Sequence, residues 1–319
     1  MSGTAVVLKK YSMGLSGGSV GTVVIPAAGL IAILAFIAFW RPAAASYFGL
    51  NLILSYLVPL VFVVMAQLVI MAIGDIDLGV GSFVALAMCI TAAFLDESVL
   101  LCVFALLLLI CAYGLVGALI SLRNLPSIIV TLGAGFVWYG VALTLFPVPG
   151  GSVPGWLSTL IRVSPPLVPL PVLVAVAVGA VSHWLMMKSA FGVSVRGFGG
   201  NPAGAGKLGW SAVRLRIAVY ALAGLFATAG GVALAGMTTT GDANVGASYT
   251  LQSIAAVIIG GGQFSGGSVA PIGAVMGAAI MLLTGSLLTF ADVSPNWQLA
   301  VQGAILIAVL SLRRILERP

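Results

Sequence analysis

Charged residues are scarce in this sequence. Among its 319 residues, 6% are Asp, Glu, Lys or Arg and 61% are hydrophobic, and the mean hydropathy is +1.23. Soluble domains carry about 25% charged residues, so the chain lacks the polar surface that a water-soluble protein of its size needs. Its apolar runs are long and continuous. They predict an all-α polytopic membrane protein, not a β-barrel built from short alternating segments.

Cysteine and histidine are also scarce. Cys89, Cys102 and Cys111 lie in apolar stretches, in odd number and without a CxxC pattern, which argues against a disulfide framework and a metal centre. His183 is the only histidine, and no Ser/His/Asp set can be assembled around it, so we do not expect an enzyme. The net charge of +6 is spread along the chain without a basic run interleaved with aromatics, so nucleic acid is not an expected partner.

Nucleotide-binding motifs are missing as well. The glycine-rich run 260–267 has no strand before it and no Lys-Ser/Thr after it, so the context of a phosphate-binding loop is absent. The pair Gly206-Lys207 looks like the end of a Walker motif. However, Asn201 stands in place of its first glycine and Leu208 in place of the Ser or Thr that coordinates magnesium. We expect no ATP and no cofactor in this chain.

Apolar runs of about 20 residues can cross a bilayer as helices. The sequence predicts about ten transmembrane helices, near residues 20–40, 52–73, 83–95, 100–122, 127–146, 167–187, 217–237, 251–259, 269–290 and 297–312. The first run is longer than the core of a signal peptide, and Arg41-Pro42 separates it from the cleavage-like Ala43-Ala44-Ala45. An uncleaved helix is therefore favoured over a cleaved signal. We treat 1–319 as a single transmembrane domain with an N-terminal tail over 1–19.

Lysine and arginine are concentrated on one side of these predicted helices. With the N-terminus in the cytoplasm, all of them fall on that side except Arg41 and Arg162. Because Lys/Arg bias near helix ends sets orientation, both termini are predicted to be cytoplasmic. The longest polar interval, from Gly192 to Arg216 within a loop over about 188–216, is then cytoplasmic too. It is either a plain connection or a docking element, in which Asn201-Pro202 would cap a short helix over 202–208.

The two halves of the chain each contain a glycine-rich interruption, from Gly74 to Ser82 and from Gly260 to Gly267. Each is followed by an apolar helix. Paired interruptions of this kind are typical of transporters built from two repeats, although glycine-rich membrane segments can also look alike by chance. The interruptions supply the predicted residues of a translocation path: Asp75, Asp77, Gly79, Gly81, Ser82, Gly261, Gly262, Ser265 and Gly266.

Asp75 and Asp77 have no basic residue near them in the sequence. A carboxylate in hydrocarbon costs at least about 2.5–3.5 kcal/mol, so both side chains must face water, a cavity or backbone donors. One interpretation is a proton or cation site. The other, which we favour, is that they cap the helix beginning over 78–82, where a carboxylate meets free N–H groups and the positive end of the helix dipole.

Three segments together resemble a known family: GDIDLGVGS (74–82), GFGGNPAGAGKLG (197–209) and LQSIAAVIIGGGQFSGGSVAPIGAVMGA (251–278). They are similar to permease subunits of bacterial ATP-binding-cassette (ABC) sugar importers of the ribose/xylose/arabinose type. The similarity extends over about 51–314. It departs from the family at Leu78-Gly79, where Leu-Ser is common, and at 204–207, where the extra glycines would weaken a short helix by up to about 1 kcal/mol each.

The resemblance implies a bacterial inner-membrane permease with a pore at the interface of two permease chains. Two cytoplasmic ATPase subunits, which carry ATP and magnesium, and a periplasmic sugar-binding protein would be its partners. It also implies an ATPase-coupling element formed by Gly200, Asn201, Pro202, Ala203, Lys207, Leu208 and Gly209. Branched-chain amino-acid permeases are more distant relatives and remain an alternative. So do an ion-coupled carrier that uses Asp75 or Asp77, and a membrane protein without a substrate path.

Overall fold

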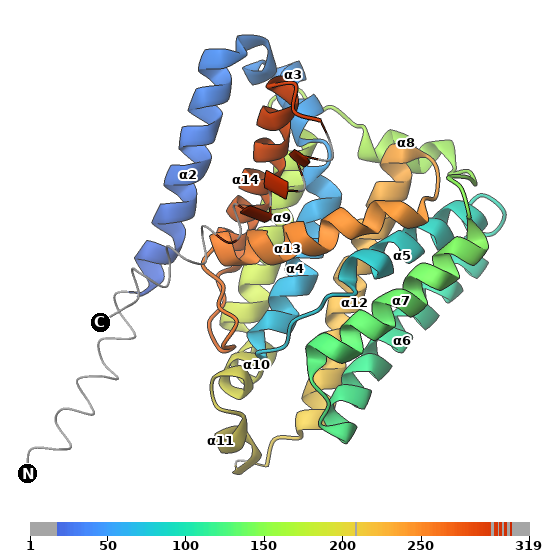
Figure 1. Cartoon of the computed structure of the whole chain (residues 1–319), viewed down its shortest axis with the longest axis vertical. Coiled ribbons are helices and arrows are strands. Elements are labelled where there is room, and N and C mark those ends of the chain that lie inside the picture. Colours follow the sequence, from blue (N-terminus) through green and yellow to red (C-terminus); the bar gives the residue numbers. More distant parts are fainter. Residues whose placement is uncertain are drawn as a thin grey trace, which may run out of the picture.

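The computed structural model describes residues 18–207 and 209–294, with isolated positions between 297 and 307. These residues form thirteen α-helices, which run largely alongside one another (Figure 1). The only β pairing among them is an isolated bridge between Gly150 and Gly241. The prediction of an all-helical protein is confirmed for this part of the chain.

The helices have the following bounds. They are α2 (Gly18–Trp40), α3 (Tyr47–Leu54), α4 (Leu57–Ala72), α5 (Val80–Phe94), α6 (Val99–Arg123), α7 (Ser127–Leu145), α8 (Gly155–Ile161), α9 (Leu170–His183), α10 (Ala190–Gly200), α11 (Pro202–Lys207), α12 (Ala212–Thr238), α13 (Gly246–Ile259) and α14 (Pro271–Phe290). Short 3-10 turns, η1 (Pro42–Ala45) and η3 (Ala243–Val245), precede α3 and α13, and a π-helical turn, η2 (Trp184–Lys188), extends α9.

The centre of the molecule is α4, whose residues are all buried except Phe62. It packs against α9, α12, α13 and α14, and α12 also packs against α5 and α6. A helix that is apolar on every face is stable only where other elements cover it completely. By contrast, large apolar side chains are exposed along the outer faces of α2, α6 and α7, for example Phe39, Leu100 and Phe136. These faces suit contact with lipid.

Six described helices are long and apolar enough to cross a membrane: α2, α6, α7, α9 with η2, α12 and α14. A seventh span results if α3 and α4, which meet at a bend of 44°, are taken together. The third and eighth predicted helices correspond to α5 and α13, which are shorter apolar helices. The tenth predicted helix, 297–312, lies mostly outside the described residues.

The prediction that Gly192 to Arg216 form a loop is wrong. Most of it is helical: α10 and α11 occupy its first part, and α12 begins at Ala212. Ser189 caps α10 by accepting a hydrogen bond from Gly192 N, and Ser211 caps α12 by accepting one from Arg214 N. Both serines supply the side-chain oxygen that is favoured at a helix start. The sequence between them does not predict a helix over α10, because this segment is rich in glycine.

The first interruption is shorter than predicted. Helix α5 begins at Val80, so Gly81 and Ser82 lie in its first turn and not in the break. The second interruption, between Ile259 and Pro271, agrees with the predicted one. The three cysteines lie in apolar helices as expected: Cys89 and Cys102 are buried and Cys111 is exposed, and all three are free.

Candidate functional site

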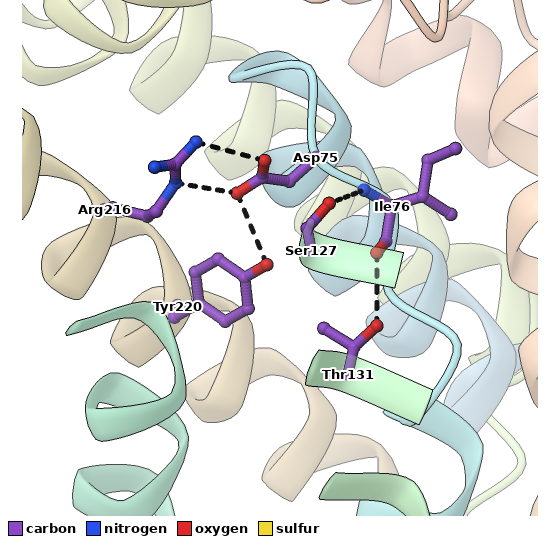
Figure 2. A network of polar contacts seen from close by, with 6 residues as sticks. All are labelled: Asp75, Ile76, Ser127, Thr131, Arg216 and Tyr220. Carbon is purple, nitrogen blue, oxygen red and sulfur yellow. Dashed lines mark hydrogen bonds and ion pairs between the residues drawn. The ribbon is translucent and has the colours of Figure 1, made fainter. Parts of the chain in front are cut away.

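The break between α4 and α5 carries a partly buried ion pair (Figure 2). Asp75 is 6% exposed, and its carboxylate accepts hydrogen bonds from Arg216 Nε at 2.9 Å and Nη2 at 3.2 Å. The Tyr220 hydroxyl donates to the same carboxylate at 3.4 Å. Arg216 and Tyr220 stand four residues apart near the start of α12, so one helix face supplies both donors. A bidentate guanidinium–carboxylate pair is among the strongest side-chain interactions.

The basic partner of Asp75 is distant in the sequence: Arg216 is 141 residues away and falls in the predicted loop, just before the predicted helix 217–237. The buried Phe198 ring lies 5.9 Å from the Arg216 guanidinium, within the range of a cation–π contact. The carboxylate therefore links the break to both α12 and α10.

Two hydroxyls of α7 hold the backbone of the same break (Figure 2). Ile76 N donates to Ser127 Oγ at 3.3 Å, and Thr131 Oγ1 donates to Ile76 O at 3.3 Å. Leu78 N donates to Thr131 Oγ1 at 3.1 Å. Irregular backbone inside a membrane protein is tolerated where side chains satisfy the freed N–H and C=O groups. No sequence pattern singles out these two residues, because hydroxyls on an apolar helix are common.

Asp77 is the second carboxylate in the break. It is fully buried, and its Oδ1 accepts a hydrogen bond from Gly79 N at 2.7 Å, directly before α5 begins. A carboxylate in this position satisfies an N–H group at a helix start and faces the positive end of the dipole. Asp77 thus bonds to the N-cap residue Gly79 in the turn before α5 and does not itself occupy the N-cap position, whereas Asp75 is a partner of Arg216.

Glycine backbones of three segments meet beside the break, and we call this meeting point the glycine junction: Ala72 to Gly74, Gly199 to Gly200, and Gly266 to Gly267. Gly267 N donates to Ala72 O at 2.8 Å. A Cβ atom at position 199 would lie 1.9 Å from Ala72 O, and one at position 266 would lie 2.8 Å from Gly74 N. Such distances leave no room for any side chain.

Backbone conformation adds to this requirement in the second interruption. Gly266 and Gly267 have φ angles of +74° and +76°, which only glycine adopts readily. The structure thus brings the two predicted interruptions into direct contact, and places both against the end of α10. That end leads directly into the predicted coupling segment.

A further contact joins the two short apolar helices. Gly81 N donates to Thr250 Oγ1 at 3.0 Å, and a Cβ at Gly81 would lie 2.0 Å from Gly246 O. The first turns of α5 and α13 therefore cross at van der Waals distance. At the other end of α13, a Cβ at Gly277 of α14 would lie 2.0 Å from Ala256 O, which agrees with the close helix contact expected of small-xxx-small spacing.

The predicted coupling segment forms a short helix, α11, at one end of the molecule (Figure 1). Asn201 caps it, because its Oδ1 accepts a hydrogen bond from Gly204 N at 2.9 Å. Trp210 N donates to Ala205 O at 3.1 Å, and Ala205 is buried while Lys207 is exposed. The predicted cap and helix are confirmed in local structure, except that Leu208 lies outside the described residues.

The remaining predicted residues have plainer surroundings. Gly200 ends α10, Pro202 and Ala203 begin α11, and Gly209 forms the following turn with a φ of +80°. Gly261 and Gly262 close the C-terminal end of α13, donating to Ile258 O and Val257 O. Ser265 is exposed, and its hydroxyl donates a hydrogen bond to the Oε1 atom of the neighbouring Gln263 at 3.4 Å. Within the described chain, no three His, Cys, Asp or Glu side chains gather into a metal site.

Residues 49–310 match the family described as branched-chain amino acid transport system / permease component. The chain is 30% identical to the galactose/methyl galactoside import permease protein of Escherichia coli, over 89% of this chain and 91% of that protein. It is also 30% identical to the autoinducer 2 import system permease protein of Photorhabdus laumondii, over 88% of this chain and 86% of that protein. No solved structure matches it significantly.

The family match extends over most of the chain, and it includes both interruptions, the ion pair and α11. In importers of this class ATP hydrolysis belongs to a separate component, which agrees with the missing nucleotide motifs. The chain belongs to the branched-chain amino acid transport system / permease component family and is a multi-pass permease component of an ABC importer.

Proposed function

We propose that this chain forms, with a second permease chain, the translocation path for a sugar or sugar-like solute in a bacterial inner membrane. A periplasmic binding protein would deliver the solute, and α11 would dock in a groove of the cytoplasmic ATPase. Ten helices in two pseudo-repeated halves would surround the path, with α5 and α13 as the broken helices of each half. The single-domain organisation over 1–319 is part of this proposal.

The glycine junction is the observation that carries the proposal. The coupling segment starts at Asn201, immediately after Gly200, and the backbone of α10 at Gly199 touches the backbone of both interruptions. Because a backbone-to-backbone contact has no flexible side chain between its members, a displacement of α11 is transmitted to both breaks. Interfaces packed in this way switch between discrete arrangements instead of deforming gradually.

The distribution of charge supports the orientation. The end of the molecule that carries α10 and α11 also carries the C-terminal end of α6 and the start of α12 (Figure 1). Its described basic residues are Arg123, Lys188, Arg196, Lys207, Arg214 and Arg216. By the positive-inside rule this end, and with it both chain termini, would be cytoplasmic. The ATPase would then bind where α11 is exposed.

The substrate class follows from the relatives that are named for galactose and autoinducer 2. The family description, which names branched-chain amino acids, favours an amino acid as the second candidate. An ion-coupled carrier is less well supported, because Arg216 already neutralises Asp75 and the backbone before α5 already engages Asp77. Of these carboxylate oxygens, only Asp77 Oδ2 is left without a hydrogen-bond partner among the described residues.

The first test is purification in mild detergent, followed by identification of the proteins that remain bound. The proposal expects an ABC ATPase and one or two kinds of permease chain. Reconstituted with that ATPase and the binding protein, the complex should take up solute in a manner that depends on ATP and is blocked by vanadate. Uptake by this chain alone, driven by an ion gradient and insensitive to vanadate, would refute the proposal.

Lys207 provides a sharper test of the coupling role. It is the exposed last residue of α11, so its reversal to Glu should leave the fold intact and place a repelling charge at the ATPase groove. We expect Lys207→Glu to lower ATP-driven uptake by about tenfold, since mispaired interface charges cost on the order of 1–2 kcal/mol. Lys207→Arg, which keeps the charge, is the control. Equal uptake by both variants would show that this end of α11 does not dock.

A further inference from the structure

A second feature of the fold is a cavity of about 360 Å³, one wall of which is α3, at the end of the molecule opposite to α11 (Figure 1). Its volume lies within the range of roughly 300–1,000 Å³ that small-molecule sites occupy. Helices α3, α13 and α14 form its walls, together with Gln298 beyond α14. The 44° bend between α3 and α4 lies at its edge, where Tyr56 joins the two helices. If α3 and α4 formed one straight helix, the turn at Tyr56 would be absent.

The polar groups in this cavity converge from three elements. Gln252 comes from α13, Ser286 and Thr289 come from α14, and Tyr56 comes from the bend. Ser286 Oγ and Thr289 Oγ1 donate to carbonyl oxygens of α14, at 3.3 and 3.1 Å. Their donor capacity is therefore used, and their remaining lone pairs are available as acceptors.

Gln252 is the most informative of these residues. It lies on a helix whose next residues, Ser253 to Ile258, are buried, yet it is itself half-buried and lines the cavity. Within the described part of the chain its amide, which offers two donors and an acceptor, has no hydrogen-bond partner. Gln298 donates from Nε2 to Thr289 Oγ1 at 3.2 Å and leaves its own carbonyl oxygen available. The cavity thus presents both donors and acceptors.

No charged side chain occurs among the described residues that line the cavity. An amino acid substrate would bring a carboxylate and an ammonium group, and burying a charge without a partner costs far more than burying a hydroxyl. An alkyl chain would leave the amide and hydroxyl groups without hydrogen bonds. A neutral solute with several hydroxyl groups satisfies the lining, and the ring of Tyr56 offers an apolar face for the C–H side of such a molecule.

A larger cavity of about 430 Å³ provides the contrast. It lies between α2, α9 and α14, and only apolar residues line it, among them Leu34, Val176 and Ala279. Such a lining suits the hydrocarbon of lipid, and nothing in it would orient a hydroxylated solute. Two cavities on either side of α14 thus differ in chemistry within one structure. The polar lining is a property of one site and not of the membrane-exposed surface in general.

From this geometry we infer that the cavity between α3, α13 and α14 is a solute site, selective for neutral polyhydroxylated molecules. Gln252, Ser286 and Thr289 are the residues that contact the solute. The inference depends on the proposed transport function, because it places the solute at the end of the chain where a binding protein would deliver it. It goes beyond the proposed function because it assigns selectivity for the solute to the permease chain itself.

The test is protection of an introduced cysteine from modification. Cys89, Cys102 and Cys111 are replaced by alanine, and Ile53→Cys, at a lining residue that is not assigned a contact with the solute, is then introduced into the purified, reconstituted permease. A charged thiol reagent that cannot cross the membrane should modify this cysteine. Neutral sugars (galactose, ribose and xylose in turn) are added as protecting ligands, and leucine is added as the charged competitor. Ser286→Cys, which is nearly isosteric, serves as a second variant if the first does not fold.

At a sugar concentration ten times its dissociation constant, the rate of modification should fall about tenfold, because only a small fraction of sites remains free. Leucine should have no effect, and Val176→Cys in the apolar cavity should not react with the charged reagent. Protection by leucine would overturn the selectivity. Absence of modification, or absence of protection by every sugar, would overturn the site. The assay needs neither ATPase nor uptake, so failure of the proposed function is detected separately, by the Lys207 variants.

Discussion

Replacement of Gly199 by alanine tests the glycine junction directly. The Cβ atom of alanine would lie 1.9 Å from Ala72 O and 2.6 Å from Gly267 N. Ordinary contact begins at 3.4 Å, so the end of α10 would have to move away from α4 by about 1.5 Å, the difference between 3.4 and 1.9 Å. The two nearest atoms both belong to the backbone, and no change of rotamer can relieve the overlap.

The energetic cost has two parts. Overpacking of a close contact typically costs about 1–3 kcal/mol. Moving α10 would also disturb the hydrogen bond from Gly267 N to Ala72 O, 2.8 Å long, which contributes on the order of 1 kcal/mol. We therefore expect Gly199→Ala to destabilise the protein by about 2–4 kcal/mol. It should also lower ATP-driven uptake more than ATP hydrolysis, because the displaced α10 would change the position of α11 relative to the two breaks.

Gly200 supplies the matched control. A Cβ at this neighbouring position would lie 3.9 Å from Gly267 Cα, in ordinary contact. Both glycines lie in α10 and neither has a positive φ, so alanine has the same helix propensity advantage at each. The assays are thermal unfolding in detergent, together with ATPase and uptake rates in proteoliposomes. If Gly199→Ala unfolds at the same temperature and couples as well as Gly200→Ala, the junction is not the connection between α11 and the breaks.

Two further predictions concern neighbouring elements. Arg216→Gln should destabilise the protein by about 3 kcal/mol, since it leaves the buried Asp75 carboxylate without its ion-pair partner. Asp75→Asn should cost less, because the Arg216 side chain is 19% exposed. The double variant should lose less than the sum of the two, as a double-mutant cycle on unfolding would measure. Ala205→Pro should uncouple ATP hydrolysis from uptake, because it removes the hydrogen bond from Ala205 N to Asn201 O. Gly206→Ala, whose new Cβ has no atom within 4 Å, should stabilise the helical conformation of α11 by up to about 1 kcal/mol and preserve coupling.

Sequence patterns were sufficient for features that depend on local chemistry. The apolar runs predicted the helices, Asn201-Pro202 predicted the cap and start of α11, and the two glycine-rich runs predicted the interruptions. Each of these follows from residues within one or two turns of one another. The predicted boundaries are wrong where a helix contains polar or glycine residues, as in α10, because composition there contradicts a helix that tertiary contacts stabilise.

Long-range contacts could not be predicted in the same way. Asp75 and Arg216 are 141 residues apart, and nothing in either local sequence specifies the other. A partial signal did exist: Ser211 is a good helix cap, and a helix beginning at Ala212 would have placed Arg216 and Tyr220 on one face, four residues apart. Recognising that cap would have moved Arg216 from the loop into the helix, although its partner would still have been unknown.

The same contacts explain why a chain so poor in charge retains two carboxylates beside each other at a helix break. An unpaired carboxylate in this setting would destabilise the fold or act as a site for a coupling ion. Here Arg216 and Tyr220 engage Asp75, and Gly79 engages Oδ1 of Asp77, so three of the four carboxylate oxygens are bonded within the protein and Asp77 Oδ2 is buried without a hydrogen-bond partner among the described residues. These bonds fix the break in place. In the proposed function the energy for transport enters through an element in contact with the breaks, and α10 with its continuation α11 meets that requirement.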